Sequence, residues 1–267
     1  IRLSLVGSEM CIRDRYMALI PDAANVWADK LPSYAPVEDQ TVQIAQIQSM
    51  LGDSVNWIDA QGVLNANKDK EIYYHTDSRW TTLGASLVWQ QIASDLGLDT
   101  SKAPALKPYV VTGDFSGNLS RTSGFESGYR EPIYAYLTEN ASDNTQMVAS
   151  YESEGIKTAE LYDRTKLDET DAYEVFLGGD YDKIDIRTTA DSTDRLLLVK
   201  DSFADCMIPF LIPYYREIIV VDADYYQKHV SDLLDKNKIT SVLFLYDCNN
   251  FVQDDKLSSI LTTDKTE

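Results

Sequence analysis

Histidine and cysteine are scarce in this sequence of 267 residues. It contains two histidines, His75 and His229, and three cysteines. Cys11 lies in an N-terminal segment that we set aside below, which leaves Cys206 and Cys248. Two cysteines are too few for a disulfide framework or a cysteine-based metal site. We therefore expect both to be buried thiols that pack as small hydrophobic side chains at the same end of a sheet.

Basic residues are also few. Lys and Arg together number 24 against 43 acidic residues, so the net charge at pH 7 is -19. A surface that binds nucleic acid or an anionic membrane needs clustered Lys and Arg, and this composition argues against both partners. The sequence also has no run of about 20 apolar residues, the length that a membrane-spanning helix requires.

The first fifteen residues, "IRLSLVGSEMCIRDR", lack both an apolar core and a small-residue cleavage site, so they do not read as a signal peptide. They resemble translated sequencing-adapter read-through. We therefore treat residues 1–15 as non-native and residues 16–267 as a single domain. A targeting signal or membrane anchor would have to lie in the missing native N-terminus.

The apolar pattern predicts an α/β fold. "LLLVK", "EIIVV" and "VLFLY" are continuous apolar strands, and residues 16–20 form another. Helical spacing appears at residues 42–51, which end before Gly52, and at residues 83–96, which end before Gly97. Continuous apolar strands separated by helices predict a three-layer α/β domain with a parallel sheet covered on both faces.

The stretch from about residue 98 to 172 has a different composition. Residues 111–128 are rich in Gly, Ser and Thr, and we expect them to form a loop. Residues 132–152 read as two strands joined by a polar turn. We interpret 98–172 as a mainly β insertion that lies over one edge of the main sheet.

Polar residues follow three of the expected strands. Asp201 and Ser202 follow "LLLVK", Asp222 and Asp224 follow "EIIVV", and Asp247 follows "VLFLY". Ligands of open α/β sheets gather at these carboxyl ends, and Ser202 stands where a nucleophile near amide donors would stand. The alternative is that Asp201 or Ser202 caps the next helix. Carboxylates can hold Mg²⁺ or Ca²⁺, but their spacing matches no ligand loop, so we expect no metal and no cofactor.

The sequence "YYHTDSRWTTLGASLVW" places Asp77 and Arg79 at the start of an amphipathic helix. An acid there is usually a cap or a partner of the helix dipole. The alternative is that Asp77 orients a catalytic base, but Arg79 cannot be that base. A guanidinium stays protonated at ordinary pH and has no lone pair to accept a proton. It can pair with Asp77 or bind a substrate anion.

Four segments resemble the DHHW family of bacterial envelope proteins, which is SGNH-hydrolase-like and related to the O-acetyltransferases that act on alginate. They are "YYHTDSRWTTLGA", "FLGG", "LLLVKDSFADCMIPFL" and "VLFLYDCNNF". The resemblance covers nearly all of the native part, and it implies an SGNH-like fold and a place in the cell envelope or outside the cell.

The resemblance also implies roles for residues. The nucleophile falls on Ser202, and the acid of an Asp-x-His dyad falls on Asp77. The oxyanion-hole asparagine falls on either Asn249 or Asn250. The matching motifs place Asp201 and Trp80 at the same site as binding residues.

The chain departs from the family pattern at the position of the catalytic base. Ser78 and Arg79 stand where the family has two histidines. Loss of the base from a Ser-His-Asp arrangement costs several orders of magnitude in rate. His75 is a possible substitute base, because in an extended strand it would point to the same side as Asp77. His229, expected on a helix, is a weaker candidate.

Three functions remain open on this reading. The first is an impaired or inactive relative of carbohydrate O-acetyltransferases and esterases that binds a cell-wall or exopolysaccharide glycan. The second is an active serine esterase or acyltransferase that uses Ser202 with His75. The third is a non-catalytic envelope scaffold.

Overall fold

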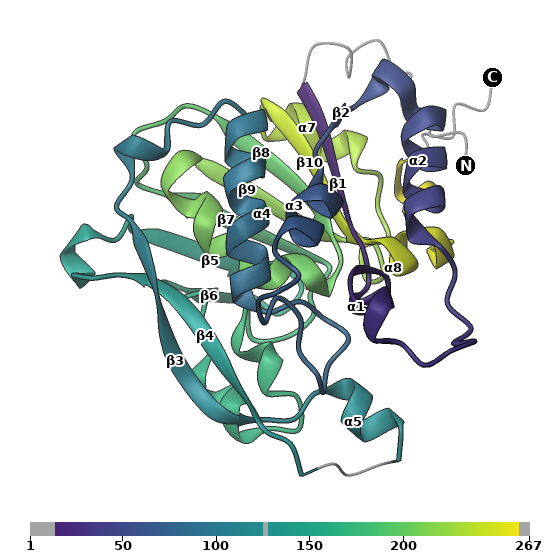
Figure 1. Cartoon of the computed structure of the whole chain (residues 1–267). Helices are drawn as coiled ribbons and strands as arrows, with labels where there is room; N and C mark the ends of the chain where they lie inside the picture. Colours follow the sequence, from purple (N-terminus) through teal and green to yellow (C-terminus); the bar gives the residue numbers. More distant parts are fainter. Residues whose placement is uncertain (1–13, 125–127, 262–267) are drawn as a thin grey trace.

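The computed structural model of the chain describes residues 14–124 and 128–261. Its centre is an eight-stranded sheet in the order β2-β1-β10-β8-β9-β7-β5-β6 (Figure 1). The five strands from β2 to β9 pair in parallel, whereas β7, β5 and β6 each pair antiparallel. These strands span Asn56–Trp57 (β2), Asp14–Ile20 (β1), Ser241–Asp247 (β10), Arg195–Lys200 (β8), Glu217–Asp222 (β9), Lys183–Thr188 (β7), Met147–Tyr151 (β5) and Ile156–Thr158 (β6).

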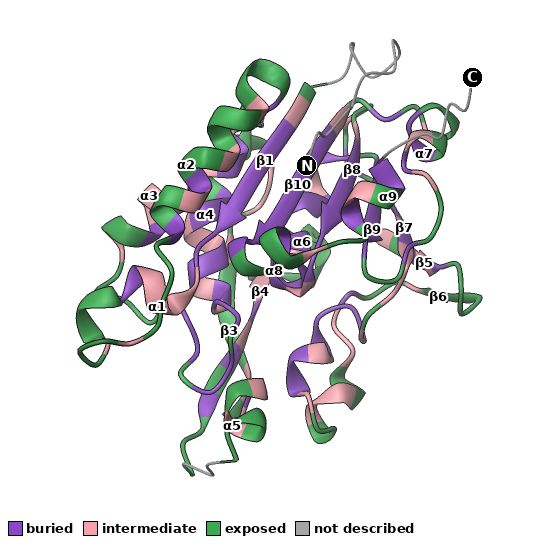
Figure 2. Cartoon of the chain, turned by 90° about the vertical axis from the view of Figure 1, so that its right-hand side faces the viewer, coloured by how far each residue is buried: buried purple, intermediate pink, exposed green. Residues whose placement is uncertain are grey.

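Helices cover both faces of this sheet. The helices span Ala23–Val26 (α1), Gln40–Leu51 (α2), Ala60–Ala66 (α3), Thr82–Asp95 (α4), Asn118–Thr122 (α5), Ile208–Leu211 (α6), Ser231–Lys236 (α7), Cys248–Gln253 (α8) and Leu257–Leu261 (α9). Alternate strand residues point to opposite faces. Leu198 and Val220 pack in the cluster that includes α3, α4 and α6, and Leu197 and Ile219 pack in the one that includes α2, α7, α8 and α9. The predicted three-layer α/β architecture is confirmed, and Figure 2 shows the buried strands between the layers.

The helix boundaries follow the expected caps. The hydroxyl oxygen of Thr81 accepts a hydrogen bond from the Gly84 amide at 3.2 Å and begins α4. Gly97, just after α4, has a φ of 67°, a left-handed conformation that glycine adopts without strain. The motif that precedes α4 is thereby fixed to the start of a long buried helix.

The middle segment contributes strands to two sheets. β3 (Leu106–Phe115) and β4 (Glu131–Thr138) form a separate antiparallel pair, and β5 and β6 extend the edge of the main sheet. The loop predicted for residues 111–128 is wrong in part, because β3 runs to Phe115 and α5 occupies Asn118–Thr122. β3 is exposed along most of its length and is held by pairing with β4, so it lacks the apolar alternation that marks a strand in sequence.

The N-terminal boundary stays a prediction. Residues 1–13 lie outside the described part. Asp14 and Arg15, which we set aside with the non-native segment, belong to β1 and pair with Ser241 and Val242. Among the described residues, no helix has the length and apolar character needed to cross a membrane.

Candidate functional site

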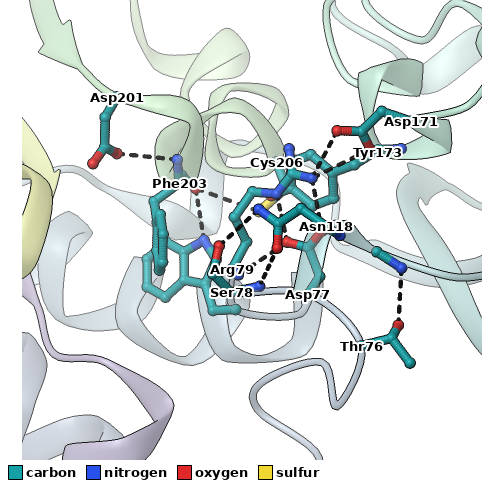
Figure 3. Close-up of polar contacts among 12 residues, drawn as sticks. Thr76, Asp77, Ser78, Arg79, Asn118, Asp171, Tyr173, Asp201, Phe203 and Cys206 are labelled. Carbon is teal, nitrogen blue, oxygen red and sulfur yellow. Dashed lines mark hydrogen bonds and ion pairs between the residues drawn. The ribbon is translucent and has the colours of Figure 1, made fainter. Parts of the chain in front are cut away.

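Trp80 connects the Asp77 motif to the segment that carries Ser202. Residues Tyr73 and Trp80 form an antiparallel bridge, so the motif between them is a tight loop. The Trp80 side chain is fully buried, and its indole nitrogen donates a hydrogen bond to the carbonyl oxygen of Phe203 at 2.6 Å. Two segments more than a hundred residues apart are therefore in direct contact, as Figure 3 shows.

Ser202 begins a 3-10 helix, Ser202–Met207, directly after β8. The cap of this helix is Asp201, whose carboxylate accepts a hydrogen bond from the Phe203 amide at 3.0 Å. Ser202 is half-buried, and within the described part of the chain its hydroxyl has no hydrogen-bond partner. Asp201 therefore takes the capping role and leaves the Ser202 hydroxyl available to a ligand.

Asp201 also orders the end of β10. Its second oxygen accepts hydrogen bonds from the Asp247 amide at 2.8 Å and from the Asn250 side chain at 2.9 Å. Burial outweighs these bonds and raises the pKa of Asp201 to about 6. Of the two asparagines, Asn250 thus lies at the site, whereas exposed Asn249 contacts Gln253 along α8.

Arg79 forms a bidentate ion pair with Asp77. Its Nε and Nη2 donate to the two carboxylate oxygens of Asp77 at 2.7 and 2.9 Å, the bidentate geometry of a strong ion pair (Figure 3). Nη2 also contacts Asp171 at 3.1 Å, and the guanidinium lies 3.8 Å from the ring centre of Tyr173. Arg79 is 7% exposed. Its side chain is bound on several sides and forms no hydrogen bond to Ser202.

The electrostatics keep this pair ionised. Burial alone would lower the pKa of Arg79, but the hydrogen bonds and charge of Asp77 raise it above its usual value. Burial alone would raise the pKa of Asp77, but the bonds and charge of Arg79, with the amides of Asn118 and Arg79, lower it. Arg79 is therefore a permanent hydrogen-bond donor and cannot accept a proton.

Gly117 makes the close approach to Asp77 possible. The next amide, of Asn118, donates to Asp77 at 2.9 Å. A Cβ added at Gly117 would overlap the Cβ, Oδ2 and Cα atoms of Asp77. No sequence pattern predicted this contact, because Gly117 lies in the stretch that we expected to form a loop.

Replacement of Gly117 tests this packing. We expect Gly117→Ala to lower the free energy of unfolding by about 1–3 kcal/mol, because the new methyl group must displace buried backbone. Gly113→Ala is the matched control, since a Cβ there meets no atom within 4 Å. Chemical denaturation of both variants measures the difference, and equal stabilities would contradict the contact.

The two histidines lie apart from Ser202. His75 is 47% exposed in its side chain and contacts Glu131 at 3.1 Å and Glu71 at 3.7 Å. The chain bends after His75, so it does not share the buried side of Asp77, contrary to the expectation for an extended strand. His229 lies just before α7, and neither histidine forms a hydrogen bond to Ser202.

A buried ion cluster lies beneath the Ser202 turn. Lys200 pairs in register with Asp222 across β8 and β9, and its ammonium contacts Asp222 at 3.0 Å and Asp205 at 2.8 Å. Burial raises the pKa of Asp205 to about 7, whereas the two carboxylates raise that of Lys200 despite its burial. The hydrophobic pattern did not predict this cluster. Lys200 occupies a buried position of β8 where the pattern predicts an apolar side chain.

The cysteines behave as expected. Cys206 and Cys248 are buried free thiols, and burial raises the pKa of each to about 12. Across residues 14–124 and 128–261, no group of three or more His, Cys, Asp or Glu side chains is placed to hold a metal ion.

A polar pocket of about 350 Å³ opens beside Ser202 at the carboxyl ends of β8, β9 and β10. Asp201, Ser202 and Asn250, which the family motifs predicted, line this pocket together with Asp222 and Asp224, which follow a predicted strand. The remaining wall residues were not predicted. The complete lining consists of Asp180, Asp201, Ser202, Asp222, Asp224, Tyr225, Tyr246, Asn250, Gln253, Asp254, Asp255 and Lys256. Asp77 and Arg79 lie outside this lining, so the two halves of the predicted site meet through Trp80 rather than in one open cleft.

Comparisons with known proteins agree with this architecture. A family model described as "DHHW protein" matches residues 10–221. A DHHW family protein from Eubacterium siraeum is 22% identical, with a TM-score of 0.79 over 96% of this chain and 84% of its own. Bacillus cereus PatB1 with a sulfonyl adduct is 22% identical, with a TM-score of 0.74 over 92% and 84%. The O-acetyltransferase domain of Pseudomonas putida AlgJ is 13% identical, with a TM-score of 0.56 over 96% and 84%. No curated protein sequence matches the chain.

Proposed function

Because the chain belongs to the DHHW family, we propose that it is a bacterial cell-envelope protein that binds a glycan beside Ser202 and does not transfer acyl groups. One observation carries the proposal: Arg79, which the motif resemblance aligns with the family's histidine, is bound to Asp77 through two hydrogen bonds. A serine hydroxyl needs a neighbouring proton acceptor to become a nucleophile, and a paired guanidinium supplies none.

The pocket supports binding as the retained function. Its wall offers an aromatic ring, Tyr225, which is 48% exposed, together with the side-chain amides of Asn250 and Gln253. Amides and carboxylates match the many hydroxyl groups of a sugar as donors and acceptors. The family resemblance, which extends to O-acetyltransferases that act on alginate, supports the same substrate class.

Hydrolysis of p-nitrophenyl acetate tests the absence of catalysis. We expect the wild-type protein and Ser202→Ala to hydrolyse this ester at the same low rate, because neither has an activated nucleophile. The measurement is the release of p-nitrophenol at pH 7–8 with both proteins at equal concentration. A wild-type rate that clearly exceeds that of Ser202→Ala would show a working base and would reject the proposal in favour of a serine esterase.

A further inference from the structure

Four carboxylates of the Ser202 pocket have no ion-pair partner among the described residues: those of Asp180, Asp201, Asp254 and Asp255. Asp201 and Asp254 accept hydrogen bonds only from amide groups. Asp222 is neutralised by Lys200, and Asp224 contacts Lys256 at 3.0 Å. By contrast, Asp180 accepts a hydrogen bond only from the Tyr225 hydroxyl, and Asp255 forms no ion pair. The pocket therefore keeps a negative charge that its own basic residues do not balance.

Tyr246 provides an independent sign of a ligand. Its side chain is 2% exposed, its ring packs at an edge against Phe251, and its hydroxyl has no hydrogen-bond partner. Buried hydroxyl groups are normally hydrogen-bonded, so an orphan needs an explanation. Tyr246 belongs to the pocket lining, and the four acids whose charges act on its hydroxyl, Asp201, Asp222, Asp224 and Asp254, line the same pocket, so the hydroxyl lies at the pocket wall.

The pocket fits an organic cation better than a metal ion. The described acidic side chains are not grouped in a way that holds a metal. A phenolic oxygen accepts a hydrogen bond from an ammonium group, and carboxylates at the rim attract its charge. Burial and the charges of Asp201 and Asp222 hold the pKa of Tyr246 well above its usual value, so the hydroxyl stays neutral and keeps both its proton and its lone pairs.

We propose that the pocket beside Ser202 contains a subsite for a primary ammonium group, formed by the Tyr246 hydroxyl with Asp180 and Asp254. The glycan that it selects then carries amino sugars whose nitrogen is not acetylated. This inference rests on the proposed glycan binding at the same pocket. A volume of about 350 Å³ lies at the small end of ligand pockets and suits one sugar unit.

Isothermal titration with two sugar trimers tests the subsite. One trimer consists of β-1,4-linked glucosamine and the other of N-acetylglucosamine, and both are titrated into the full chain at about 150 mM salt, where distant charges are screened. We expect the glucosamine trimer to bind about tenfold more tightly, since partly exposed ion pairs are individually weak. Equal affinities would overturn the subsite and leave glycan binding intact, whereas no binding of either trimer would overturn both proposals.

Three variants separate a specific subsite from general attraction to an acidic protein. Asp180→Asn/Asp254→Asn should abolish the preference, whereas Asp53→Asn/Asp168→Asn, with the same change in charge at exposed positions outside the pocket, should keep it. Tyr246→Phe should weaken the preference without loss of stability, because its hydroxyl has no partner to lose. Equal losses in the two double variants, or an unchanged preference in Tyr246→Phe, would overturn the assignment. Calcium binding that the pocket variant abolishes would reassign the site to a metal.

Discussion

Arg79→His should give this protein a Ser202-dependent esterase activity. Asp77 is buried, two backbone amides hold its carboxylate, and Trp80 connects the motif to the Ser202 turn. A histidine at position 79 could donate a hydrogen bond to the Asp77 carboxylate, which now binds the guanidinium. A positioned general base contributes about 10²–10⁴-fold in rate, so we expect a rise of that order in hydrolysis of p-nitrophenyl acetate.

Two controls make the result specific. Arg79→Gln removes the same charge without a base and should stay at the wild-type rate. Arg79→His/Ser202→Ala should return the rate to that level, because the new base then has no hydroxyl to activate. A rate for Arg79→His equal to that of Arg79→Gln would mean that the site has diverged by more than one residue.

The fold was predictable where local pattern and burial agree. In "LLLVK", "EIIVV" and "VLFLY", apolar residues stand at both odd and even positions. The structure buries both sets of side chains, one set on each face of the sheet. β3 escaped prediction because its stability comes from pairing with β4 and not from burial. Hydrogen bonds between strands leave no trace in the hydrophobic pattern of either one.

The site was predictable only in its motif residues. The positions of Asp77, Arg79 and Ser202 came from a family pattern, and the pairing of Arg79 with Asp77 followed from their charges. The other partner of Arg79, Asp171, lies 92 residues away in sequence, and no periodicity connects them. Tyr246 was not predicted as a site residue, because a tyrosine at the end of a buried strand is typical of the hydrophobic core.

Lys200→Met should cause a large loss of stability. Lys200 is 2% exposed and holds two buried carboxylates, those of Asp205 and Asp222. Removal of one partner from a buried ion cluster leaves uncompensated charge and costs about 3–5 kcal/mol. We expect a loss of that size in the free energy of unfolding at pH 8. As a control, Lys68→Met removes an exposed pair with Asp29, and its effect should stay under about 1 kcal/mol.

The loss caused by Lys200→Met should shrink as the pH falls. Burial already raises the pKa of Asp205 to about 7, against about 3.9 in an unfolded chain, and without the ammonium both acids titrate at still higher pH. A carboxyl group whose pKa is raised by folding stabilises the folded state below its unfolded pKa, and this contribution is lost as the pH rises through its folded pKa. Urea denaturation at pH 5 and pH 8 should therefore show the larger penalty at pH 8. A penalty that is the same at both pH values would mean that water reaches these carboxylates and that Lys200 does not neutralise a buried cluster.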